Sequence, residues 1–156
     1  MWRFTPQTAA NYTMCAWIYP RSNTTDQDIF FYGSQANIQM FLVKISSRID
    51  IGDWNSESVS SAASISRDRW YHICAGRQNA TSNNWPNQTI YINGVLDSAT
   101  KDDRYTIGGG ETNIFAIGSD SYGSNFFNGT IDEVMFFNRT LNSSEVSVIY
   151  NMNMSV

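Results

Sequence analysis

The stretch Phe127–Tyr150, FNGTIDEVMFFNRTLNSSEVSVIY, decides how the rest of this chain is interpreted. Its first half predicts a glycine-containing turn followed by a strand. Val134 and Phe136 share one face of that strand. The Asp132–Glu133 pair ahead of them breaks strict alternation, as a β-bulge does. The segment therefore predicts a bulged strand.

The second half of the stretch predicts a short helix. Asn142 stands three residues before Glu145, which is the spacing of a capping box. Val146, Ile149 and Tyr150 follow at helical spacing and give the helix one apolar face. No other segment shows a clear helical pattern. We expect this helix to close one end of a structure built from sheets.

Most of the remaining chain consists of short apolar segments between polar turns. The segments expected to be strands are Tyr12–Tyr19, Ile29–Tyr32, Ile38–Ile45, Arg48–Ile51, Val59–Ile65, Trp70–Gly76, Gln88–Ile92, Val95–Leu96, Tyr105–Ile107 and Asn113–Ile117. Tyr12–Tyr19 is largely apolar on both faces, which indicates a central strand covered on both sides. Asn93–Gly94 is the strongest hairpin signal. Frequent turns without a βαβ rhythm predict an all-β, antiparallel two-sheet jelly-roll sandwich with one short C-terminal helix.

Length, charge and hydropathy limit the number of domains and the kinds of partner that this chain can have. A chain of 156 residues suits a single domain, which we place at residues 1–156. The net charge of -4 argues against nucleic acid and anionic membranes as partners. No apolar run is long enough to span a membrane. We expect the domain to be one module of a larger exported protein.

Export is indicated by an excess of glycosylation sequons, Asn-x-Ser/Thr. Eight occur, where the composition alone predicts roughly three. They start at Asn11, Asn23, Asn79, Asn87, Asn128, Asn138, Asn142 and Asn153. The sequence therefore predicts a glycoprotein that is extracellular or at the cell surface.

The two cysteines, Cys15 and Cys74, allow two interpretations. They are either two buried thiols or one disulfide. A disulfide would close a loop of about 60 residues and contribute about 4 kcal/mol in the chain-entropy model. Because the sequons indicate export, we favour the disulfide and an oxidising compartment.

Four segments carry a family resemblance. They are YTMCAWIYP (12–20), WYHICAG (70–76) with TIYINGVLD (89–97), FAIGSDSYG (115–123) and the opening stretch. In this order they resemble the laminin-G-like, or concanavalin A-like, jelly-roll superfamily, which includes the pentraxins. The resemblance covers roughly residues 12 to 150. It implies adhesion or carbohydrate recognition on an antiparallel sandwich.

The pentraxins sharpen two expectations. Their conserved disulfide joins a T-x-C strand to an H-I-C strand, which implies that Cys15 pairs with Cys74. Their calcium loop resembles Asp120–Gly123, although the family's preceding Glu-Gln and following acidic insertion are absent. The resemblance implies that Asp120 is a calcium ligand, and it implies the same more weakly for Asn37. Since calcium takes six to eight oxygens, these two predict at most a weak site.

Catalysis is not expected. Glycosidases on this fold use two acids on one strand face, close together. Asp50 and Asp53 fall on opposite faces, as do Asp132 and Glu133. His72 is the sole histidine and lies in a strand motif, so we expect it to be structural.

Loop aromatics are the remaining functional signal. Trp54, Trp85 and Tyr122 fall in expected loops, where their rings either stack on sugars or fold back on the sandwich. The favoured hypothesis is a non-catalytic extracellular recognition or adhesion module that binds glycan or protein, with neighbouring domains or identical subunits as further partners. The alternative is a glycosylated structural subunit of a cell-surface layer, filament or virion surface.

Overall fold

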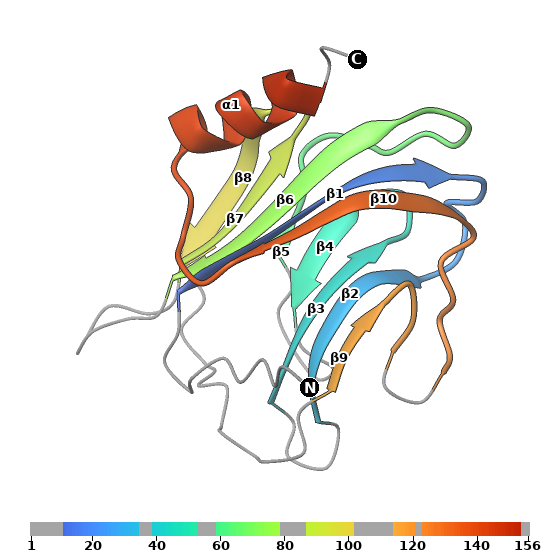
Figure 1. Cartoon of the computed structure of the whole chain (residues 1–156). Coiled ribbons are helices and arrows are strands. Elements are labelled where there is room, and N and C mark those ends of the chain that lie inside the picture. Colours follow the sequence, from blue (N-terminus) through green and yellow to red (C-terminus); the bar gives the residue numbers. More distant parts are fainter. Residues whose placement is uncertain are drawn as a thin grey trace.

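Two antiparallel sheets face one another in the computed structural model (Figure 1). It describes residues 11–34, 39–52, 59–78, 87–101, 114–120 and 123–153. Within them, sheet A contains, in spatial order, β10 (Gly129–Phe137), β1 (Tyr12–Pro20), β6 (Tyr71–Gln78), β7 (Asn87–Ile92) and β8 (Val95–Lys101). Sheet B contains β5 (Val59–Ser60), β4 (Ile49–Gly52), β3 (Gln39–Ile45), β2 (Gln27–Ser34) and β9 (Ile114–Ile117). The predicted jelly-roll sandwich is confirmed.

The core between the sheets follows from the alternation of each strand. Along β1, Met14, Ala16 and Ile18 point inward and are fully buried. They pack with side chains of sheet B such as Ile29 and Phe30. The intervening residues of β1 face the other side of sheet A. The predicted burial of this strand on both faces is confirmed.

The predicted bulge lies in β10. Cys15 is paired with Met135, whereas Trp17 is paired with Asp132, so β10 has one extra residue in this interval. Glu133 has a positive φ of 48°, as a bulge residue can adopt. Beyond the bulge, Met135 faces the outer side of sheet A, and Phe136 faces the core.

The helix α1 (Ser143–Asn153) begins at the predicted capping box. The Glu145 backbone N–H donates to the Asn142 Oδ1 at 3.0 Å, and the Asn142 N–H donates to the Glu145 carboxylate at 2.9 Å. This backbone hydrogen bond, together with Arg139, lowers the pKa of Glu145. The expected position of the helix was wrong. It lies against the outer face of sheet A, near β7 and β8, instead of closing an end (Figure 1).

Two strand predictions differ from the structure in length. Only Val59–Ser60 of the predicted strand Val59–Ile65 pairs with a neighbour. Further along, the N–H groups of Ala62 and Ala63 donate to the Asp97 carboxylate instead of to a backbone carbonyl. The N–H groups of Ser61 and Ile65 still donate to backbone carbonyls, so the pairing is interrupted between them. In contrast, β8 extends to Lys101 beyond the predicted Val95–Leu96. Beyond Leu96 the residues of β8 lack an apolar alternation, so the sequence pattern does not indicate a strand there. The strand forms at the edge of the sheet through backbone pairing with β7. The predicted strand Tyr105–Ile107 lies outside the described residues.

Candidate functional site

The outer face of sheet A has three cross-strand side-chain pairs along β1 and β6. We call this row of side-chain pairs, as distinct from the backbone hydrogen bonds, the ladder. Cys15 lies opposite Cys74, and Trp17 lies opposite His72. Tyr19 and Trp70 continue the same register, with ring centroids 5.5 Å apart. Because side chains two residues apart share a face, the three pairs lie in one row along the sheet.

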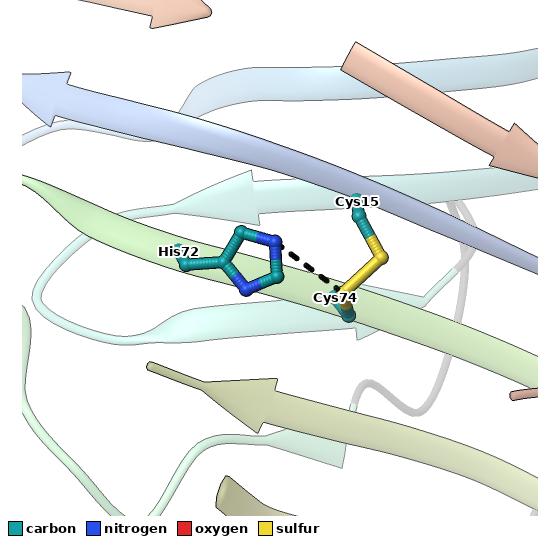
Figure 2. Close-up of side chains that lie close together, drawn as sticks. All are labelled: Cys15, His72 and Cys74. Atoms are coloured by element: carbon teal, nitrogen blue, oxygen red, sulfur yellow. Dashed lines mark hydrogen bonds between the residues drawn. A yellow bond between two sulfur atoms is a disulfide. The ribbon is translucent and has the colours of Figure 1, made fainter. Parts of the chain in front are cut away.

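The first pair of the ladder is a disulfide between Cys15 and Cys74. The Cα atoms are 4.1 Å apart, and both residues are fully buried. Figure 2 shows the His72 imidazole beside it, with Nε2 3.9 Å from the Cys74 Sγ. These three residues are the only cluster of potential metal-ligating side chains within the described part of the chain. Since both sulfurs are bonded to each other, the cluster is not a metal site. The disulfide implied by the resemblance is confirmed.

The second pair is covered by the helix. The Trp17 ring lies 5.3 Å from His72 and 5.6 Å from Tyr150 of α1, measured between centroids. His72 is only 1% exposed, and burial lowers its pKa to about 4. His72 is therefore neutral at pH 7. His72 is thus buried, and its purely structural role stays a prediction.

The third pair is open to solvent. Trp70 is 44% exposed, Tyr19 is half-buried, and their rings meet edge to face at 61°. On the neighbouring strand β10, Thr130 is paired with Tyr19 and Asp132 with Trp17, and both β10 residues are exposed. We call Tyr19, Trp70, Thr130 and Asp132 the aromatic platform.

The aromatic platform combines two kinds of contact. Its ring faces attract apolar C–H groups and cations. One Asp132 carboxylate oxygen accepts the Glu133 N–H at 2.8 Å, which positions the group. The Thr130 hydroxyl can donate and accept. A flat ligand with one apolar face and a hydroxyl edge matches this set of groups, because ligand sites combine apolar area with a few placed polar atoms.

The sequence pattern does not reveal the platform, because Tyr19 and Trp70 fall in expected strands and the pattern points to loop aromatics as ligand contacts. A signal was available. Once Cys15 is set opposite Cys74 in an antiparallel pair, Tyr19, four residues on, must face Trp70, four residues back. The three loop aromatics, Trp54, Trp85 and Tyr122, lie outside the described residues, and ligand contact there stays a prediction.

The calcium expectation rests on Asp120 and Asn37. Asp120 is buried, and its carboxylate accepts hydrogen bonds from the Ser124 N–H at 2.8 Å and from the Ser124 hydroxyl. These bonds shape the loop around Asp120. Asn37 lies outside the described residues. Calcium binding at these two residues stays a prediction.

The carboxylates considered for catalysis are engaged in local structure. Asp50 is buried and accepts a hydrogen bond from the Ser60 hydroxyl. Asp53 lies outside the described residues. Asp132 is paired with Trp17, and Glu133 lies in the bulge of β10 directly after it.

Sequons differ in how available their Asn side chains are. Four of these side chains are exposed, namely Asn11, Asn128, Asn138 and Asn142. Asn23 is half-buried, and its amide nitrogen donates to the Ile65 carbonyl at 2.7 Å. The side chains of Asn79, Asn87 and Asn153 are not described. Glycosylation of the eight sequons stays a prediction.

Comparisons with solved structures give the same fold. A heptameric SAP-like pentraxin from Limulus polyphemus is 18% identical, with a TM-score of 0.65, covering 91% of this chain and 70% of that chain. Domain 4 of AbnA, an extracellular arabinanase from Geobacillus stearothermophilus in complex with arabinotriose, is 20% identical with a TM-score of 0.66, covering 90% and 66%. The botulinum neurotoxin type G receptor binding domain is 20% identical with a TM-score of 0.65, covering 92% and 38%.

Comparisons of the sequence identify the family of this chain but no curated relative. The search of curated proteins finds no match to this sequence. Among the described residues, no helix has the length and hydropathy to cross a membrane. The family model of the concanavalin A-like lectin/glucanases superfamily matches residues 3–147, so the chain belongs to this superfamily.

Proposed function

We propose that this chain is a non-catalytic extracellular recognition module that binds glycans on the aromatic platform. The observation that carries the proposal is the solvent-open Tyr19–Trp70 pair beside Thr130 and Asp132. A pyranose has an apolar C–H face and a rim of hydroxyls. Stacking on Trp70 would bury that face, and Asp132 and Thr130 would hydrogen-bond the hydroxyls.

Three further observations support this proposal. The superfamily includes lectins by its description, and the arabinanase domain similar to this chain is in complex with arabinotriose. The buried disulfide fits an oxidising, extracellular compartment. The chain spans 66% of the length of the arabinanase domain and 38% of the length of the neurotoxin chain.

A glycan array with the purified protein tests the proposal. Stacking on one aromatic ring contributes about 1.4 kcal/mol, so we expect Trp70→Ala to weaken binding about tenfold. Trp70→Phe keeps a ring and should recover most of the affinity. Met152→Ala, which removes an exposed apolar side chain on α1, is the matched control and should bind as the wild type does.

The same array separates the alternatives. Binding on the platform should be unchanged by a calcium chelator, whereas loss with chelator would move the site to the Asp120 loop. Binding that Trp70→Ala leaves intact would refute the platform. No glycan binding together with ordered self-association would favour the structural subunit, which the exposed sequon asparagines also suit.

A further inference from the structure

An apolar groove of about 340 Å³ lies where the end of β10 meets the start of α1. Its apolar lining consists of Phe137, Leu141, Val148 and Ile149. Val148 is 52% exposed, so the groove opens to solvent. Polar groups stand at one side, where Arg139 contacts the Glu145 carboxylate at 2.7 Å. Apolar surface of this kind is usually covered in a working protein.

Two sequon asparagines are direct neighbours, in the chain, of residues that line the groove. Asn138 lies between the lining residues Phe137 and Arg139, and Asn142 directly follows the lining residue Leu141. Both side chains are exposed. The Asn142 Oδ1 accepts the Glu145 N–H, so the cap holds the amide with its oxygen inward and leaves Nδ2 for attachment.

We propose that N-linked glycans on Asn138 and Asn142 cover this groove. The occupant is an N-acetylhexosamine of the chain's own glycan. Its acetyl methyl and C–H face would lie on Leu141 and Val148, and its hydroxyls would meet the Arg139–Glu145 pair. Attachment to residues that are next to the lining residues in the chain makes this contact intramolecular, so it needs little intrinsic affinity.

The covalent step is a group transfer that leaves oxidation states unchanged. The asparagine Nδ2 forms a bond to the anomeric carbon of the sugar and releases one proton to solvent. The bond between that carbon and a lipid diphosphate donor breaks, and the lipid diphosphate leaves with the electron pair. A transferase of the secretory route catalyses this step on exposed sequons.

The other sequons provide contrast. Asn23 uses its amide nitrogen in a hydrogen bond to Ile65, which competes with modification. Asn128 precedes β10, whereas Asn138 follows it. At about 3.3 Å per residue, these two asparagines are on the order of 30 Å apart. A glycan on Asn128 therefore starts far from the groove and serves as the control.

The test uses the protein secreted from a glycosylating eukaryotic host. Glycopeptide mass spectrometry measures occupancy at each sequon. Asn138→Gln removes one acceptor, and Ser144→Ala removes the second sequon while keeping the Asn142 cap. Groove access is measured by the fluorescence of anilinonaphthalene sulfonate, an apolar dye.

We expect occupancy at Asn138 and Asn142, and dye fluorescence several-fold higher in the double variant Asn138→Gln/Ser144→Ala than in the wild type. Adding Val148→Ser to that double variant should reverse the increase, and Asn128→Gln should bind dye as the wild type does. Absence of glycan at both positions would overturn the proposal, as would equal dye binding with and without the glycans. A glycosylated protein that dimerises through the groove in analytical ultracentrifugation would also overturn it, because a second copy would then be the occupant.

Discussion

Acidification should destabilise this fold through His72. The folded protein buries this imidazole against Trp17 and Tyr150 with its pKa near 4, whereas an unfolded chain has a histidine pKa of 6.5. Because the unfolded state binds the proton more readily, stability is complete above about pH 6.5 and falls as the pH drops toward 4. Since one pKa unit corresponds to 1.36 kcal/mol, the full loss is about 3 kcal/mol, of which about 2 kcal/mol is gone at pH 5.

The assay is urea unfolding followed by far-UV circular dichroism at pH 7.5 and pH 5, under non-reducing conditions. Carboxylates also titrate in this range, so the wild type is compared with His72→Gln and His72→Phe, which cannot bind the proton. Each variant can lower the stability at both pH values. The expected result is that the wild type loses about 2 kcal/mol more between the two pH values than either variant does.

An equal loss of stability in wild type and both variants would refute the reasoning. It would mean that His72 gains a proton in the folded state at little cost. NMR titration of this single histidine gives an independent value, and a midpoint near 6.5 would lead to the same conclusion.

Three further predictions concern the scaffold. Replacing both cysteines, Cys15→Ser/Cys74→Ser, should lower the free energy of unfolding by about 4 kcal/mol, measured in urea; no change would show that the cross-link does not restrict the unfolded chain. Asn142→Ala removes the helix cap and should cost about 1 kcal/mol in thermal unfolding, whereas Ser144→Ala should be close to neutral; equal effects would contradict the capping role. Gly94→Ala should cost more than 1 kcal/mol, because φ is +79° and the new Cβ would stand 3.0 Å from Tyr150; an unchanged melting temperature would contradict this.

Local chemistry made several features predictable. Asn142 and Glu145 form their hydrogen bonds within one turn, so their spacing alone predicts the helix start. The Asn93–Gly94 turn adopts the positive φ values that these residue types favour. The bulge at Asp132–Glu133 showed as a break in alternation. Each of these depends on neighbours in the chain, which the sequence contains.

The placement of the helix and of the platform was not predictable in the same way. The apolar face of α1 shows that it packs on something, but not on which surface. The outer face of sheet A receives it because Tyr91, Met135 and the disulfide offer an apolar area there. Similarly, Asp132 and Thr130 join the platform only because β10 pairs with β1. These two strands lie more than 100 residues apart in the chain, so the sequence pattern does not show the pairing.

Local propensity and residue patterns are enough to predict the alternating strands, the turns, the cap and the membership of a lectin-like superfamily. They do not show that Tyr19 and Trp70 stay open to solvent while Trp17 and His72 are covered, because that depends on the packing of α1. The physical reason is the length and position of one helix: α1 covers the disulfide, its Tyr150 covers the second pair of the ladder, and the third pair remains exposed.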